Sequence, residues 1–266
     1  MMANRLTPVF VSHGGGPMPL LGDPGHTEMV DCLKGLAAKL ARPNAVVVVS
    51  AHWEEKVATI TASENPSLIY DYYGFPEESY AITYPCRGEP TLAQELHSLL
   101  EAAAIDVALD GERGLDHGVF VPLKIMWPEA NVPCVQLSLL NSLDPSSHIA
   151  VGKALRGLGR ENVWLIGSGF SFHNLKAFFA TDNASSRQMN RDFEWWLRDT
   201  CSSTSCSEAE RMKRLIHWIE APGARFCHPR EEHLLPLHVC YGAAQRRCSE
   251  ALNLKIMGKE SSMYVW

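Results

Sequence analysis

The segment Ala45–Ser50, with the sequence AVVVVS, is a short and continuous apolar run. Such runs are typical of parallel strands that are buried on both faces, because a strand with one face in solvent alternates apolar and polar side chains. The same pattern predicts strands at Pro8–Ser12, Ile105–Leu109, Pro133–Leu139 and Val163–Ser168. An alternating segment, Val57–Ala62, is expected to be a further strand, in antiparallel orientation.

Between the strands, apolar residues recur at helical spacing. These segments predict helices at Glu28–Leu40, Pro90–Ala104, Val119–Trp127, Ser146–Leu158, Ser186–Thr200 and Glu208–Ile219. One or two more helices are expected between His233 and Leu254, with a final strand at Ser262–Val265. Strands that alternate with helices predict an α/β fold, a three-layer sandwich with a mostly parallel central sheet. Because no repeat or long linker divides the chain, residues 1–266 are expected to form a single domain.

The composition is that of a globular protein that binds neither nucleic acid nor a membrane. Of 266 residues, 46% are hydrophobic and 20% are charged, which is too apolar for a disordered chain. The net charge of −6 argues against nucleic-acid binding, which requires a basic surface. No apolar window reaches the roughly 18 residues of a membrane span, and no secretory signal is expected at the N-terminus. The eight scattered cysteines are expected to be reduced thiols in a cytoplasmic protein.

The stretch Ser63–Glu89 has no helical or strand period and is expected to be a loop. Loops of this length in compact domains are commonly functional. It contains six aromatic residues, which are Tyr70, Tyr72, Tyr73, Phe75, Tyr80 and Tyr84. This aromatic content favours an ordered loop at the mouth of a pocket.

Three histidines lie at or just beyond the carboxyl ends of expected strands. His13 follows Pro8–Ser12 directly, His52 follows Ala45–Ser50 after one alanine, and His173 lies shortly after the strand that ends at Ser168. The carboxyl ends of parallel strands lie along one edge of a sheet, where ligands bind. One such histidine alone is more often structural, but three at one edge favour a shared site, and imidazole is a ligand for zinc, iron, copper and nickel.

A second cluster has His228, His233 and His238 spaced five residues apart. On a helix this spacing separates side chains by about 140°, so at most one or two of them can reach a single metal ion. His233, at a loop-to-helix turn, can point back toward the sheet edge, whereas His228 is expected in the loop and His238 in the core. Glu231 or Glu232 is either a carboxylate ligand or, as we favour, an acid in the first helical turn that interacts with the helix dipole.

His117 follows Asp116 in a turn that is expected to open a helix, with Asp116 as its cap. His117 is therefore either an incidental residue of this turn or an imidazole that faces a substrate, and spacing alone favours neither. The remaining histidines are expected on surface loops or helices and are assigned no role: His26, His97, His148 and His217.

Six segments, taken together and in this order, resemble the class III extradiol ring-cleavage dioxygenases, and specifically their 4,5-DOPA dioxygenase branch. They are Ser12–Gly14, Ser50–Trp53, Ile69–Pro76, Leu115–Gly118, His173–Leu175 and Glu232–Leu237. The resemblance extends from about residue 8 to residue 256. It departs at Gly14–Gly16, where the family commonly has a shorter turn.

The resemblance implies a non-haem Fe(II) centre, in which Zn(II) can also be found. It implies that His13, His52 and His233 are the metal ligands, that His173 is the catalytic acid and base, and that His117 is a catalytic residue on the substrate side. The expected substrates are a DOPA-like catechol and O₂, and the expected product is a semialdehyde.

Two other functions are compatible with the same histidines. One is a zinc-dependent hydrolase, in which a metal-bound water is the nucleophile. The other is a non-catalytic protein that binds a metal ion or a small molecule on this fold. Turnover of a catechol with Fe(II) and oxygen distinguishes the dioxygenase from both.

Overall fold

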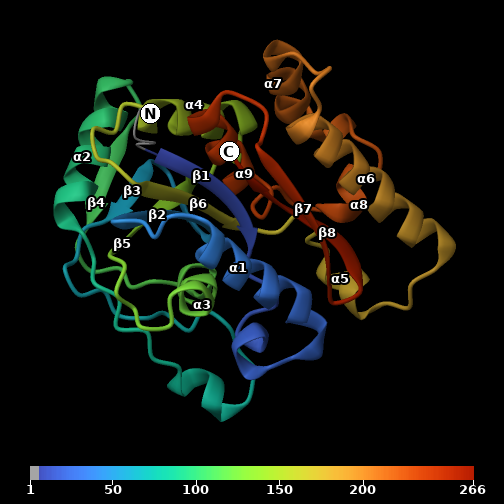
Figure 1. Ribbon diagram of the computed structural model, residues 1–266, viewed down its shortest axis with the longest axis horizontal. Coiled ribbons are helices and arrows are strands. Elements are labelled where there is room, and N and C mark those ends of the chain that lie inside the picture. The colour runs from blue at the N-terminus through green and yellow to red at the C-terminus, as the bar shows by residue number, and fades with distance from the viewer. Residues whose placement is uncertain (1–5) are drawn as a thin grey trace.

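Eight strands form one sheet in the computed structural model, which describes residues 6–266 (Figure 1). Their order across the sheet is β4-β3-β5-β2-β6-β1-β8-β7. The strands are β1 (Leu6–Ser12), β2 (Ala45–Glu55), β3 (Ala58–Thr61), β4 (Val107–Asp110), β5 (Cys134–Leu140), β6 (Val163–Gly169), β7 (Glu250–Ile256) and β8 (Lys259–Val265). The four central strands β5, β2, β6 and β1 are parallel, whereas β3 and β8 run antiparallel to β5 and β1. The expected mostly parallel sheet is confirmed.

Helices cover both faces of the sheet and complete the expected three layers (Figure 1). One face packs against α1 (Thr27–Lys39) and α3 (His117–Met126). The other packs against α2 (Pro90–Ala102), α4 (Pro145–Leu155) and α9 (Leu235–Ala244), while α6 (Ala184–Ser202) packs on β8. The shorter helices are α5 (Leu175–Phe179), α7 (Glu208–Ile216) and α8 (Ala224–Cys227), with 3₁₀ turns at Met18–Leu21, Pro24–His26, Glu77–Ala81 and Trp218–Glu220. Within residues 6–266, no helix is both long and apolar enough to cross a membrane.

The central strand β2 shows why its apolar run is continuous. Val47 and Val49 are fully buried in the core beside α9, and Val46 and Val48 are fully buried in the core beside α1 and α3. Because both faces of the strand are covered, no position on it requires a polar side chain.

The C-terminal hairpin departs from the expectation. The segment from His233 to Leu254 was expected to be helical, but its helix is α9 alone, and the chain then enters β7. Glu250–Ile256 alternates apolar and polar residues, the pattern of a strand with one covered face. Met257 and Gly258, with φ of 50° and 79°, form a two-residue turn that joins β7 to β8. The other expected strands and helices are present, with ends shifted by a few residues.

Candidate metal centre

His13 is the residue that follows β1, and it is 2% exposed. Its backbone N–H donates to the Gly169 carbonyl at the end of the neighbouring β6. Its ring Nδ1 donates to the Gly14 carbonyl at 2.9 Å, which leaves Nε2 as the nitrogen with a free lone pair. His13 Nε2 lies 3.3 Å from His52 Nε2.

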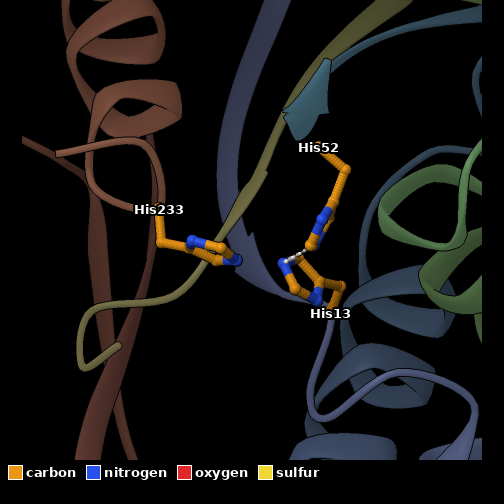
Figure 2. Close-up of side chains that lie close together, drawn as sticks. All are labelled: His13, His52 and His233. Atoms are coloured by element: carbon orange, nitrogen blue, oxygen red, sulfur yellow. Dashed lines mark hydrogen bonds between the residues drawn. The ribbon is translucent and has the colours of Figure 1, made fainter. Parts of the chain in front are cut away.

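His52 lies inside β2 rather than beyond its end, which corrects the expected position. The register of β2 against β5 shifts between Val49 and Glu54, so His52 belongs to an irregular part of the strand. Such irregularities redirect side chains and are common beside active sites. His52 Nδ1 lies 3.6 Å from a carboxylate oxygen of Asp71, and its other nitrogen faces His13 (Figure 2).

His233 approaches the same point from the turn before α9. Its carbonyl accepts a hydrogen bond from Phe170 N–H just after β6, and its Nδ1 donates to Glu232 at 2.9 Å. Its Nε2 is buried and has no hydrogen-bond partner among the described residues. The ring points toward His13 and His52, with centroid separations of 5.2 and 5.0 Å (Figure 2).

This arrangement fits a bound transition-metal ion. His13, His52 and His233 each offer a ligand atom, and these atoms lie within 4.8 Å of one another. Burial, together with repulsion from neighbouring histidines, lowers the pKa of all three well below the usual value, so the rings are neutral and can coordinate. Three imidazole nitrogens suit iron or zinc, and the unpartnered Nε2 of His233 is satisfied if it binds a metal ion.

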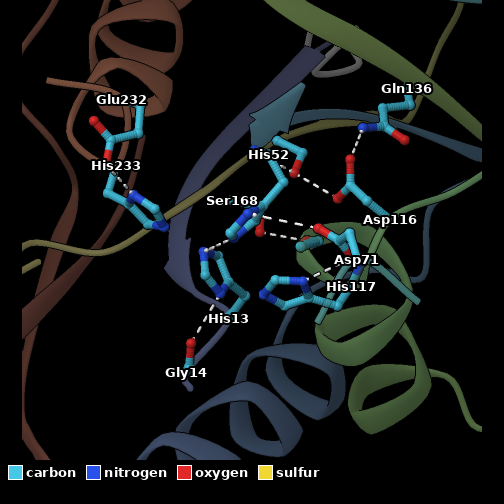
Figure 3. A network of polar contacts seen from close by, with 12 residues as sticks. His13, Gly14, His52, Asp71, Asp116, His117, Gln136, Ser168, Glu232 and His233 are labelled. Atoms are coloured by element: carbon cyan, nitrogen blue, oxygen red, sulfur yellow. Dashed lines mark hydrogen bonds and ion pairs between the residues drawn. The ribbon is translucent and has the colours of Figure 1, made fainter. Parts of the chain in front are cut away.

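His117 begins α3, and its ring lies 3.9 Å from that of His52 between centroids. Its backbone N–H and its Nδ1 both donate to Asp71 Oδ1 at 2.9 Å (Figure 3). His52, Asp71 and His117 could themselves hold a metal ion, but the short contacts of Asp71 are hydrogen bonds from His117 nitrogens. Asp71 was not identified as a site residue from the sequence, where its place between Tyr70 and Tyr72 was the only signal.

Asp116 is the N-cap residue of α3, as expected, but its side chain makes no capping hydrogen bond. The buried carboxylate instead accepts hydrogen bonds from Ser50 Oγ and from the amide of Gln136 (Figure 3). Ser50 Oγ in turn accepts from His52 N–H, so this network supports the strand segment that carries His52. Gly118 lies against the same network, and a Cβ there would overlap with Ser50 Oγ.

His173 stacks on His233, with the ring centroids 3.3 Å apart and an interplanar angle of 14°. Glu232 contacts both rings, since its Oε1 lies 3.3 Å from His173 Nδ1 and 2.9 Å from His233 Nδ1. The prediction that Glu232 belongs to the first turn of a helix was wrong, because α9 begins only at Leu235. Arg230 contacts its second oxygen at 3.3 Å.

Two histidines that were expected on the surface are buried. His26 accepts from Gly15 N–H at 3.0 Å and contacts Asp23 at 2.6 Å, which fixes the glycine loop after His13. A Cβ on Gly14, where φ is 80°, would lie 2.7 Å from the His26 ring. His148 accepts from Leu140 N–H and has a structural role.

The other histidines lie away from the cluster. His228 is buried in the loop after α8, where it donates to the Ser171 carbonyl, and His238 is in the core, where it donates to the Leu215 carbonyl. His97 is partly exposed on α2, and His217 is exposed after α7.

The histidines line a cavity of about 440 Å³. The expected loop contributes Tyr72, Tyr73 and Phe75 to its wall, and the segment after β6 contributes Phe178 and Phe179. The cluster is therefore placed at the bottom of an aromatic pocket, which can exclude water from a bound aromatic ring.

Comparison with known proteins gives the family. The family model described as the catalytic LigB subunit of aromatic ring-opening dioxygenase matches residues 15–262. The chain is 43% identical to Dioxygenase tasH of Hapsidospora irregularis, over 90% of this chain and 78% of that protein. It is 34% identical to the 4,5-DOPA dioxygenase extradiol of Mirabilis jalapa (88% and 85% covered) and 35% identical to that of Escherichia coli K12 (91% and 87%).

A crystal structure of an uncharacterized protein from Escherichia coli K12 has the same fold, with a TM-score of 0.75 and 28% identity. It covers 98% of this chain, and this chain covers 99% of it. These findings confirm the resemblance to the 4,5-DOPA dioxygenase branch. Because the family model spans most of the chain, this protein belongs to the LigB family of aromatic ring-opening dioxygenases.

Proposed function

We propose that this protein is a metal-dependent extradiol dioxygenase that opens the ring of a catechol beside its two hydroxyl groups and incorporates O₂, to give a semialdehyde acid. The observation that carries the proposal is the convergence of three neutral imidazoles on one point at the bottom of an aromatic cavity. DOPA is the substrate that the resemblance implies.

In this proposal His13, His52 and His233 hold Fe(II), with Zn(II) as an alternative occupant. When bound, the ion would supply coordination positions for the two catechol oxygens and for O₂ and would relay electron density between them. The three Nδ1 atoms face outward, toward Gly14, Asp71 and Glu232. These contacts set the tautomer of each ring, so that the Nε2 atoms are the ones available for coordination.

His173 is proposed to accept a proton from a catechol hydroxyl and to return it later, when the ring opens. An imidazole is the suitable group, since histidine is the side chain that most often acts as a general acid and base. Glu232 Oε1 lies 3.3 Å from His173 Nδ1, and its negative charge would stabilise the protonated ring. His117 is proposed to contact the substrate from the opposite wall, in an orientation that Asp71 maintains.

The test is to load the purified protein with Fe(II) under anaerobic conditions and then to add a catechol and oxygen. Stoichiometric oxygen consumption together with a yellow semialdehyde product is expected. A parallel Zn(II)-loaded sample is the control, and it should consume no oxygen. Absence of oxygen uptake with every catechol, in protein that contains full Fe(II), would contradict the proposal and leave the hydrolase or the binding protein.

A further inference from the structure

The wall of the cavity has an unusual chemical composition. Apart from five histidines, the described residues that line it are glycine, methionine, leucine, phenylalanine and tyrosine. Within residues 6–266, the lining includes no lysine, arginine, aspartate, glutamate, asparagine, glutamine, serine or threonine. No acidic or basic side chain other than a histidine is therefore available at the wall to pair with a charged substituent on a ring.

Several of the polar groups that reach the wall are already engaged in hydrogen bonds. Tyr72 donates its hydroxyl to the Ser79 carbonyl at 2.7 Å. The amide of Gly14 donates to Ser12, and that of Gly15 donates to His26. A charged substituent at this wall would gain none of these hydrogen bonds to offset any loss of its hydration, whereas an apolar substituent would bury apolar surface against the wall.

Two arginines that contact carboxylates beside the histidines are engaged as well. Arg230 contacts both oxygens of Glu54 and one oxygen of Glu232. Arg113 contacts Asp116 at 3.3 Å and lies over the ring of Trp53. Neither arginine lines the cavity, so neither is in place to bind the carboxylate of an amino acid.

The rim of the cavity is apolar and exposed. Tyr73 is 92%, Phe179 is 82% and Leu175 is 61% exposed, and all three line the cavity. Large apolar side chains that are exposed together at one site are characteristic of a surface that binds an apolar ligand. This rim extends the aromatic wall outward from the histidines.

We propose that the substrate of this site is a catechol whose substituent is uncharged and apolar, such as an alkyl or aryl group, rather than an amino acid such as DOPA. This inference rests on the proposed dioxygenase function for the position of the diol, which the histidines hold. The substituent then extends along the aromatic wall toward Leu175 and Phe179.

The first experiment compares ligands that differ only in charge. 4-Propylcatechol is matched with 3-(3,4-dihydroxyphenyl)propanoate, in which a carboxylate replaces the terminal methyl group, and with dopamine, in which an ammonium group replaces it. DOPA, which carries both a carboxylate and an ammonium group, completes the set. Binding to the Fe(II)-loaded protein is measured anaerobically by calorimetry, and kcat/KM is measured by oxygen uptake. The apolar catechol is expected to bind at least about tenfold more tightly than each charged one. Equal or tighter binding of DOPA or of the propanoate would overturn the inference.

The second experiment places a cation at the rim. Leu175→Arg should reduce or reverse the preference for 4-propylcatechol over the propanoate. Ile219→Arg is the matched control, because Ile219 is 49% exposed and does not line the cavity; its preference should equal that of the wild type. An unchanged preference in Leu175→Arg would contradict the proposed path of the substituent.

The two readouts separate this inference from the proposed function. Preferential binding of the apolar catechol without oxygen uptake would support the substrate class and contradict the dioxygenase. Oxygen uptake with DOPA as the preferred substrate would support the dioxygenase and contradict the substrate class.

Discussion

Two carboxylates, Asp71 and Glu232, lie on opposite sides of the histidine cluster, and each contacts one proposed metal ligand and one proposed catalytic histidine. On the first side, Asp71 accepts twice from His117 and lies 3.6 Å from His52. Burial alone would raise the pKa of Asp71, but the hydrogen bonds and the charge of His117 and His52 outweigh it and lower the pKa. Asp71 is therefore an ionised acceptor.

On the second side, Glu232 contacts His233 at 2.9 Å and His173 at 3.3 Å. Burial would raise its pKa as well, but the hydrogen bond from His173 and the nearby Arg230 contribute to a net lowering. Arg230 also pairs with Glu54 on β2, so this carboxylate is linked by a cation to the central sheet.

Asp71 and Glu232 have the same role toward their histidines, but different contacts hold the two carboxylates in place. Asp71 belongs to a long loop and is held mainly by the start of α3, whereas Glu232 lies in the turn before α9 and is held by an arginine. On both sides a carboxylate orients a pair of imidazoles, which fixes their tautomers and increases their basicity. The division into two pairs can be tested residue by residue.

The largest effect, on the amount of iron retained, is expected when the metal-ligating histidine next to either carboxylate is removed. His52→Ala and His233→Ala should each reduce the iron retained after Fe(II) loading and gel filtration to background, because three ligands are the minimum for such a site. His217→Ala, at an exposed position outside the cluster, is the control and should retain iron. Full iron content in either ligand variant would remove that residue from the proposed set.

The second largest effect, on turnover, is expected when the proposed catalytic histidine next to either carboxylate is removed. His173→Ala and His117→Ala should keep the metal and lose turnover, by roughly 10²–10⁴-fold for a proton-transfer group. Iron content and kcat measured on the same samples separate this outcome from ligand loss. Normal turnover of His173→Ala would show that it has no acid or base role.

A smaller effect is expected when the carboxylates become amides. Asp71→Asn and Glu232→Gln preserve shape but remove the charge, and each should weaken Fe(II) affinity by about 10–100-fold, as measured by competition with a chelator. Arg230→Gln should weaken it by no more than about fivefold, because exposed ion pairs contribute up to about 1 kcal/mol. A loss in Arg230→Gln as large as that in Glu232→Gln would mean that Glu232 orients the second pair only together with Arg230.

Much of the fold was predictable from the sequence because strands buried on both faces, such as Ala45–Ser50, have a continuous apolar run. That pattern also placed His13 and His52 at one edge of the sheet. The final strand was expected, but β7, its partner in the hairpin, was missed, although the alternation in Glu250–Ile256 and the glycine turn after it were visible.

The contacts that hold the site histidines in place were less predictable from the sequence. Asp71 contacts His117 across 46 positions of sequence, through a loop with no periodic pattern that could indicate its path. The burial of His26 likewise depends on the fold of the glycine loop, which short-range spacing does not specify. Strand patterns predict where the histidines lie, whereas long-range contacts decide what holds them.

The carboxyl group of Glu194 on α6, which is 7% exposed, contrasts with those of Asp71 and Glu232. It accepts from Ser262 Oγ at 2.6 Å, and its other oxygen has no hydrogen-bond partner among the described residues. Burial raises the pKa of Glu194 to about 7, whereas the pKa values of Asp71 and Glu232 are lowered. The difference follows from their neighbours, since hydroxyl groups compensate burial less than imidazoles do.

Glu194 has a higher pKa in the folded protein than in the unfolded chain, so the unfolded chain ionises first as the pH rises. Its contribution to stability is complete below about pH 4.5 and is lost as the pH rises to about 7, by up to about 3 kcal/mol.

Glu194→Gln, which does not titrate, should therefore unfold at a higher temperature than the wild type near pH 8 and at a similar temperature near pH 5. Glu220→Gln, at a position 78% exposed, is the matched control and should show no such pH dependence. If the melting temperatures of Glu194→Gln and the wild type differ equally at both pH values, Glu194 is ionised in the folded protein, and burial without imidazole partners does not keep a carboxylate protonated here.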